Sequence, residues 1–185
     1  MAYDSDLDIA LRQEARPGAL RVHYTITNEA GQPVYVYTCV AGPDYGPLPH
    51  RAYTALRDRP KALHLFLGLP PVPAAWRLYA RVSPFASCLL PRQSVTGYVE
   101  VPVPVREWSP YFPDDQSPDT PVVSTDWVIL TTECFREKDA IFLKKADGYA
   151  GRFRGRGYPQ QRAGAHLRLS APVAVHKRTD DFVRF

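Results

Sequence analysis

Hydrophobic and polar residues alternate along much of the chain, most clearly near the N-terminus. Apolar residues occupy every second position in residues 7–11 and 20–27, and β-branched and aromatic residues fill residues 34–37. A period of two places one set of side chains on a buried face and the other in water, as in a β-strand. Turn-forming residues separate these segments at 16–18 and 28–31. This region is predicted to form an antiparallel β-meander.

The most regular alternation lies between Val95 and Val105, where valine or glycine occupies nearly every odd position. Pro102 and Pro104 remove two backbone donors that would point to the same side of such a strand. That side cannot pair with a neighbour. The segment is therefore predicted to be an edge strand with its valines facing the core, protected from aggregation by its own prolines.

The middle of the chain is rich in proline: 15 of the 19 prolines lie between Pro43 and Pro121. Proline lacks the backbone donor that helices and central strands need, so this part is predicted to hold long loops and edge strands. Residues 41–61 are predicted to be a loop packed by its own tyrosines, in which residues 51–57 could form one or two helical turns. Further strands are predicted at residues 63–69, 76–82, 126–135, 140–143 and 167–175.

Many short strands separated by turn-forming residues indicate an all-β protein rather than a βαβ array. A chain of 185 residues is long enough for one well-buried core, and a hydrophobic fraction of 45% excludes a disordered chain. We expect one antiparallel β-sandwich domain that spans residues 1–185 and carries long proline-rich loops.

Two segments resemble strands of small, mostly uncharacterised bacterial proteins with an immunoglobulin-like β-sandwich. They are LRVHYTITNEAGQPVYVY at residues 20–37 and SVTGYVEVPVPVREWSPYF at residues 94–112. The resemblance rests on strand patterns and covers about a third of the chain, so it implies an immunoglobulin-like fold and no particular activity. The strands are also similar to those of bacterial β-sandwich proteinase inhibitors, but no segment matches a reactive-site loop.

The N-terminal residues 1–6 are acidic and lack the basic and apolar regions of a secretory signal. No apolar run reaches the roughly 18 to 20 residues that a membrane-spanning helix needs. We therefore expect a cytoplasmic protein that has no membrane partner.

The three cysteines, Cys39, Cys88 and Cys134, are far apart in the sequence and form no CxxC pair. This spacing supports neither a disulfide framework nor a zinc site. The cysteines are expected to be small buried residues with reduced thiols.

No catalytic, metal-binding or cofactor-binding motif is present. The sequence lacks GxSxG, the Walker A loop, HExxH and a GxGxxG after a strand. The acidic residues at 114–119 lack the ligand order of a calcium loop and are interpreted as a solvated turn. His23, His64 and His166 alternate with apolar neighbours and are expected on solvent-exposed strand faces. The sequence predicts no metal, no cofactor and no catalytic residue.

Aromatic residues gather in one loop, at Trp108, Tyr111 and Phe112. Large rigid side chains of this kind can anchor a protein partner. They can equally close the open end of a sandwich by packing against its own core.

Positive charge is concentrated in residues 144–178, which hold nine Lys or Arg and one acidic residue, Asp147. Arg152, Arg154 and Arg156 occupy alternate positions beside aromatic residues and glycines, an arrangement that suits a phosphate backbone and stacked bases. The alternative is a solvated loop whose charge aids solubility.

Three functions are compatible with these features. The sequence favours a non-enzymatic protein-interaction module, which binds a protein partner or itself through a strand edge or the aromatic loop. The alternative is nucleic-acid or polyanion binding by the basic segment, which is less favoured. The third is an enzyme with a site on its loops.

Overall fold

The computed structural model describes residues 6–58, 61–69, 82–111, 120–155 and 161–177. Their regular structure consists of thirteen strands and one short 3-10 turn, so the predicted all-β class is confirmed. The described part of the chain contains no helix that is long and apolar enough to cross a membrane. The strands are β1 (Leu7–Arg16), β2 (Ala19–Asn28), β3 (Val34–Ala41), β4 (Pro47–Leu48), β5 (Tyr53–Asp58), β6 (Lys61–Phe66), β7 (Phe85–Leu89), β8 (Ser94–Pro102), β9 (Val105–Arg106), β10 (Val122–Arg136), β11 (Ala140–Lys144), β12 (Gly151–Gly155) and β13 (Gln161–His176), and the turn is Glu137–Asp139.

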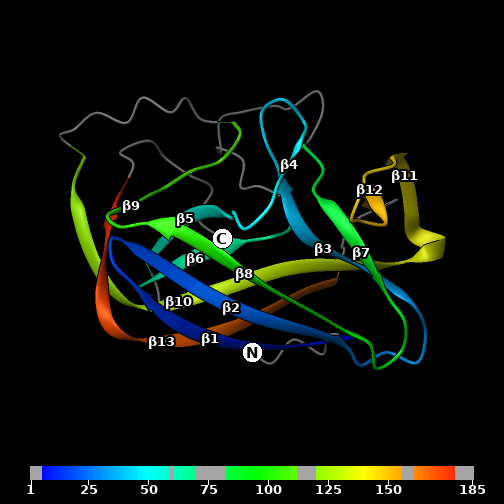
Figure 1. The fold of residues 1–185 in the computed structure, drawn as a ribbon, viewed down its shortest axis with the longest axis horizontal. Coiled ribbons are helices and arrows are strands. Elements are labelled where there is room, and N and C mark those ends of the chain that lie inside the picture. The colour runs from blue at the N-terminus through cyan, green and yellow to red at the C-terminus, as the bar shows by residue number, and fades with distance from the viewer. Residues whose placement is uncertain (1–5, 59–60, 70–81, 112–119, 156–160, 178–185) are drawn as a thin grey trace.

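The strands form two sheets that pack against each other (Figure 1). The small sheet has three antiparallel strands in the order β1-β2-β8. The large sheet follows the order β11-β12-β7-β3-β10-β13-β9, with β6 and β5 attached beside β10 and β4 beside β3. Two pairs in the large sheet, β10 with β6 and β13 with β9, are parallel, so the arrangement is not antiparallel throughout as predicted. Long connections join both pairs, which permits the parallel direction.

Strand β10 is the centre of the large sheet. On one side, its residues 122–134 pair with β13. On the other side, residues 128–131 pair with β6 and residues 134–136 pair with β3. Residues 128–135 are all buried, as expected for a strand with neighbours at both edges and covered faces. The strand predicted at residues 126–135 is confirmed, and it is buried from Val128 onward, whereas Trp127 is exposed.

The main core lies between the two sheets. Apolar side chains of the small sheet alternate with polar ones and face the large sheet. The core includes Leu7, Leu20, Val22, Tyr24, Ile26, Val99 and Val101 from the small sheet, and Val34, Val36, Leu63, Leu65, Val128, Leu130 and Val175 from the large sheet. Gly97 of β8 has no room for a side chain, because a Cβ there would lie 2.4 Å from the Tyr24 hydroxyl oxygen. The opposite, polar face of the small sheet is left toward solvent.

The predicted meander at the N-terminus is only partly correct. Strands β1 and β2 form a hairpin, but β3 lies in the large sheet between β7 and β10. The side chain of Asn28 helps the chain to change sheets, since its Nδ2 donates to the carbonyls of Gln32 and Leu89 and its Oδ1 accepts from the N–H of Ala30. Nearly every residue of β3 is buried, which fits a central strand and not the edge of a half-exposed sheet.

Strand β8 is an edge strand, as predicted, but it is shorter than the predicted segment. It pairs with β2 along its whole length, and no strand of the described residues pairs with its other side. The strand ends at Pro102, the Val103-Pro104 peptide bond is cis, and Val105–Arg106 then pairs with β13 of the large sheet. Prolines at this point leave no donors for a continuing ladder.

The loop predicted at residues 41–61, with its helical turn at 51–57, is wrong in its second half. Residues Tyr53–Asp58 form strand β5, which pairs with β6. Thr54 forms an isolated bridge with Trp108 on the other side. Two neighbours therefore decide the conformation of this segment, against its local helical preference. The strand predicted at residues 76–82 lies outside the described residues except for Val82.

We predict that Val101→Asp lowers the free energy of unfolding by about 3 kcal/mol or more, because it puts an unpaired charge into the core. Val101 is 3% exposed. The adjacent change Glu100→Gln is the control and should cost less than about 1 kcal/mol, since this carboxylate is on the solvent side. Urea denaturation measures both effects. Equal losses in the two variants would contradict the assignment of the faces.

Candidate functional site

The aromatic residue Trp108 packs against its own chain. Its ring centroid lies 5.3 Å from that of the buried Tyr53, and the Arg51 guanidinium carbon lies 5.7 Å from its ring centroid. The backbone N–H of Trp108 donates to the carbonyl of Thr54 at 2.9 Å, and the N–H of Thr54 donates back at 2.9 Å. These contacts favour the interpretation that Trp108 closes an end of the sandwich.

The second aromatic residue, Tyr111, also has a partner within the chain. Its hydroxyl oxygen accepts a hydrogen bond from the backbone N–H of Val82 at 2.8 Å. Phe112, the third member of the predicted site, lies outside the described residues. The structure therefore places Trp108 and Tyr111 in contacts within their own chain.

The basic residues Arg152 and Arg154 lie on strand β12, which pairs with β11. In this register, Arg152 is opposite Lys144 and Arg154 is opposite Ile141. Arg156 lies outside the described residues. The predicted extended backbone is therefore present at the first two arginine positions.

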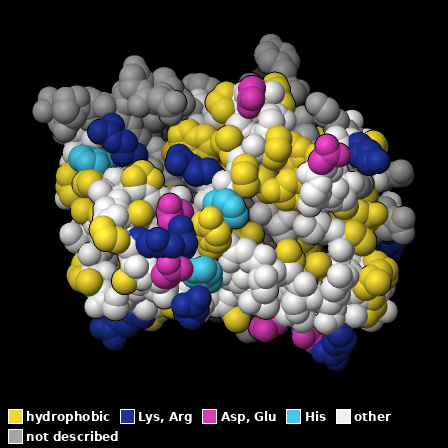
Figure 2. Space-filling view, viewed as in Figure 1, with side chains coloured by type: hydrophobic (Ala, Val, Ile, Leu, Met, Phe, Trp, Pro, Cys, Tyr) yellow, Lys and Arg dark blue, Asp and Glu magenta, His cyan; other side chains and the backbone are white. Residues whose placement is uncertain are grey.

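A polar network covers the solvent side of the small sheet, and sequence analysis did not identify it. Figure 2 shows acidic, basic and histidine side chains gathered in one cluster over β2 and β8. Arg21 is central to the network: its Nε and Nη2 each donate to Oε2 of Glu100 at 2.7 Å. Its Nη1 lies 3.5 Å from Oε1 of Glu14, so Arg21 joins a carboxylate of β1 to one of β8.

Glu14 connects the network to the two hairpin strands. Its carboxylate accepts from Nε2 of His23 at 2.6 Å and from Nε of Arg16 at 2.7 Å. The hydrogen bond from His23, together with the charges of Arg16 and Arg21, lowers the pKa of Glu14. Glu14 is therefore a carboxylate held in its charged form by its neighbours and not a poised proton acceptor.

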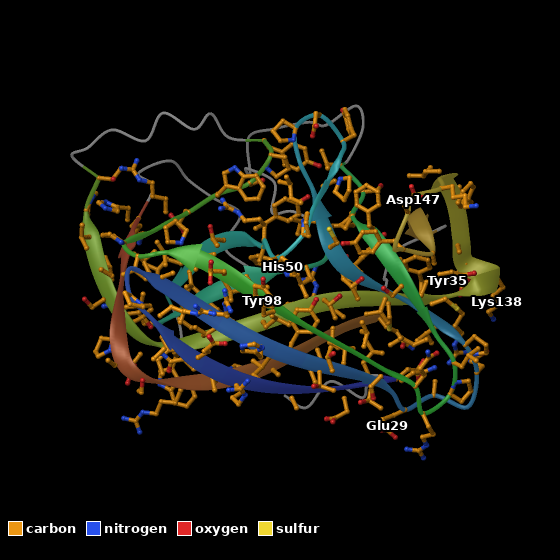
Figure 3. All side chains as sticks on the ribbon, in the orientation of Figure 1. Glu29, Tyr35, His50, Tyr98, Lys138 and Asp147 are labelled. Atoms are coloured by element: carbon orange, nitrogen blue, oxygen red, sulfur yellow. The ribbon has the colours of Figure 1, made fainter. Side chains whose placement is uncertain are left out.

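Tyr98 of β8 lies between an arginine and a histidine. The ring of His50 is parallel to the Tyr98 ring with the centroids 3.9 Å apart, and the Arg21 guanidinium carbon lies 4.4 Å from the Tyr98 centroid (Figure 3). His50 adopts a φ of 63°, and its carbonyl accepts from the backbone N–H of Glu100 at 2.8 Å. The loop that carries His50 is thereby attached to the edge of β8.

This network can hold β1, β2 and β8 in place. Its two arginines and two carboxylates balance in charge, and each of these carboxylates already bonds an arginine. Its residues alternate with core residues on three strands and come together only through the strand register. Nothing in the linear sequence indicates that register.

The hydrogen bond from Glu100 to His50 also shows how the backbone of β8 is oriented. Because this N–H points away from β2, the N–H and carbonyl groups of the other even-numbered residues of β8 point the same way. The bond from Asn28 to the carbonyl of Gln93 agrees, since it lies on the β2 side at an odd position. Backbone groups of Ser94, Thr96 and Tyr98 therefore face outward. We call this side of residues 94–98 the β8 edge.

A second polar group is buried on the large sheet, on the face of β10 opposite the main core. Nε2 of His64 lies 2.5 Å from Oγ1 of Thr131, and Nη2 of Arg162 donates to Oε1 of Glu133 at 2.9 Å. The backbone N–H of Leu69 donates to Oε2 of Glu133 at 3.2 Å. The expectation that His64 is exposed is wrong, because β6 lies between β5 and β10 and both of its faces are covered.

Burial lowers the pKa of His64 to about 3, and the nearby charges of Arg57 and Arg162 act in the same direction. The imidazole is therefore neutral near neutral pH. Gly164 lies close to the pair, since a Cβ there would be 3.3 Å from Oγ1 of Thr131. The His64 imidazole and the Thr131 hydroxyl therefore form a tightly packed buried pair.

The cysteines are in two different environments. Cys39 and Cys134 are buried, and burial raises the pKa of both thiols, that of Cys134 to about 12. Cys88 is exposed, so the prediction that all three are buried is wrong for this residue. It lies on β7, where Ser87 and Cys88 are the two residues that are not buried. In the part of the chain that the structure describes, no three His, Cys, Asp or Glu side chains are grouped in a way that could hold a metal ion.

No family model, no curated protein and no solved structure matches this chain. A functional proposal therefore has to rest on the geometry of its own residues.

The buried His64 predicts a loss of stability in mild acid. Unfolding exposes this imidazole, whose pKa then returns to about 6.5, whereas in the folded state it stays near 3. Stability is thus fully present above pH 6.5 and falls as the pH decreases toward 3, by roughly 1.4 kcal/mol per pH unit from this group. Urea denaturation at about pH 7 and about pH 4.5 should show a contribution of roughly 2.7 kcal/mol.

The variant His64→Gln, which keeps a group able to bond Thr131, should lack this part of the pH dependence. His166→Gln is the matched control. His166 is exposed, and it lies opposite Ile129 of β10, the residue that His64 faces from the other side. If His64→Gln loses as much stability as the unmodified protein between these two pH values, the assignment of His64 as a buried, neutral imidazole is wrong.

Proposed function

We propose that this protein is a non-enzymatic protein-interaction module, which binds an extended segment of a protein partner at the β8 edge. The observation that carries the proposal is the outward direction of the backbone groups of Ser94, Thr96 and Tyr98, which have no strand partner among the described residues. An added strand would satisfy these groups by main-chain hydrogen bonds. The immunoglobulin-like arrangement and the cytoplasmic location expected from the sequence belong to the same proposal.

The composition of the β8 edge supports this proposal. Residues 94–98 contain no charged residue and no proline, the features with which proteins usually block an exposed strand edge. Blocking features occur only farther along the strand. There, the carbonyl of His50 occupies the N–H of Glu100, and Pro102 has no N–H at all. A partner strand is therefore limited to residues 94–98.

Two other sheet edges, at β1 and β11, are less suitable for an added strand. Strand β1 carries several charged residues and contacts β13, where the N–H of Ser170 donates to Oε1 of Gln13 at 2.9 Å. Strand β11 has exposed apolar residues, Phe142 and Leu143, but its ladder with β12 is irregular between Phe142 and Lys144. An irregular strand interrupts the even spacing of backbone groups that a ladder requires. The β8 edge has no such irregularity.

The polar network makes the β8 edge rigid before a partner arrives. The bond between Arg21 and Glu100 fixes β8 to β2, and the ring stack fixes Tyr98 between Arg21 and His50. An edge that is already ordered loses little conformational entropy on binding. The side chains of Tyr98 and His23 lie on the solvent face of the small sheet. There they would contact side chains of the partner and determine which partner sequences bind.

A second candidate function is polyanion binding by the basic segment at residues 144–178. The extended backbone of β12 supports this candidate, because it gives Arg152 and Arg154 alternate positions on one strand. This candidate predicts a steep decrease of binding with salt concentration, whereas strand addition at the uncharged β8 edge predicts a weak one.

Thr96→Pro tests the proposed function, since it removes one outward N–H and leaves the bonds to β2 intact. Pro102 already occupies an equivalent outward position in the same strand. Extended peptides selected from a random library on the unmodified protein should bind Thr96→Pro at least about tenfold more weakly. Thr96→Val keeps the N–H and is the control, with binding close to that of the unmodified protein.

Circular dichroism and thermal denaturation check that Thr96→Pro is folded. Val95→Pro, which removes an inward bond to β2, should by contrast lose stability. Selection that yields no binding peptide, or peptides that bind Thr96→Pro as well as the unmodified protein, would overturn the proposal.

A further inference from the structure

We infer that the partner at the β8 edge is a second copy of this chain, paired antiparallel about a two-fold axis at Thr96. This inference rests on the proposed function, because it needs the same outward backbone groups. It goes further by naming the partner and the register.

The length of the β8 edge determines the register in which two copies would pair. One end is set by Gln93, whose backbone carbonyl bonds Asn28 and lies next to the turn, and the other by Glu100, whose N–H bonds His50. The outward groups between these limits belong to Ser94, Thr96 and Tyr98, and Thr96 is at the middle. A two-fold axis there places Thr96 opposite Thr96 of the second copy, and Ser94 opposite Tyr98. Every outward group then finds a partner, in about six backbone hydrogen bonds.

The side chains are compatible with this register. Two threonines at facing positions are a favourable cross-strand pair, and no like charges meet along residues 94–98. Just beyond each end, the register brings Glu100 toward Arg92 of the second copy, which has the opposite charge. Arg92 forms an ion pair with Glu29 of its own chain, but its side chain is 76% exposed and can also meet the carboxylate of a second copy. Charge complementarity at both ends therefore favours this register over a shifted one.

A second copy fits the β8 edge better than a longer partner strand does. The free part of the edge spans residues 94–98, and an identical strand running in the opposite direction presents a free part of the same length and the same polarity. A longer strand would meet the His50 carbonyl at Glu100 and the missing donor at Pro102. In the dimer, the two small sheets would become one continuous sheet across the two-fold axis.

Cysteine cross-linking tests the register. In a background of Cys88→Ser, which removes the exposed thiol, Thr96→Cys puts two thiols opposite each other at the two-fold axis. Their Cα atoms would be about 5.5 Å apart, within the range of a disulfide. Ser94→Cys is the register control, because Ser94 faces Tyr98 and not itself. Thr25→Cys is the control for position on the sheet, because Thr25 is paired with Thr96 on the neighbouring strand, away from the edge.

Under mild oxidation, Thr96→Cys should form a covalent dimer at least about tenfold faster than either control. Sedimentation equilibrium of the unmodified protein should show a reversible dimer, and Thr96→Pro should weaken its association by about tenfold or more. Equal cross-linking of the three variants, or a monomer at every concentration, would overturn the inference. If selected peptides bind in a Thr96-dependent way while the protein stays monomeric, the proposed function stands and the second copy is wrong.

Discussion

Strand β10 is the constraint on which the arrangement of the other strands depends, because it supplies backbone groups to neighbours on both sides. It carries β13 along one edge and divides its other edge between β6 and β3. This sharing builds a large sheet whose inner face is wide enough to cover the apolar side of the small sheet. The small sheet then has one face in the core, one face in water and β8 at its margin.

The polar network and the β8 edge both follow from the position of β8 as the edge strand of the small sheet. A strand with one neighbour has an unpaired row of backbone groups, and this chain blocks the row at one end only. The block combines a carbonyl from the His50 loop, which bonds Glu100, and a proline at position 102. The charges that fix β8 to β2 lie on the solvent face and leave residues 94–98 uncharged. Strand addition needs an ordered strand with open backbone groups, and β8 has its ordered end near Glu100 and its open groups at residues 94–98.

Local patterns in the sequence predict the strands that have one buried face and one solvent-exposed face. Strands β1, β2 and β8 follow from period-two alternation alone, and the length of β8 was overestimated only because the pattern continues past Pro102. The same rule predicts the strand at β6 correctly but not its environment: both faces of β6 are covered, so His64 is buried and not exposed as predicted. It also misses β5, which is stabilised by β6 and by the bridge from Thr54 to Trp108.

The candidate site was harder to predict than the fold. Trp108 and Tyr111 stand out in the sequence by their size, but their contacts are intramolecular. The residues around Tyr98 come from three strands and one loop, and a register that no local pattern records brings them together. The direction of the backbone groups at Thr96 has no sequence signal of its own.

Amide hydrogen exchange, followed by NMR on dilute protein without a partner, tests the central claim most directly. The claim is that the backbone groups of the β8 edge are open. We expect the amides of Thr96 and Tyr98 to exchange rapidly, whereas those of Gly97 and Val99, which bond β2, and that of Glu100, which bonds His50, exchange slowly. Protection of Thr96 and Tyr98 equal to that of Gly97 and Val99 would contradict the account.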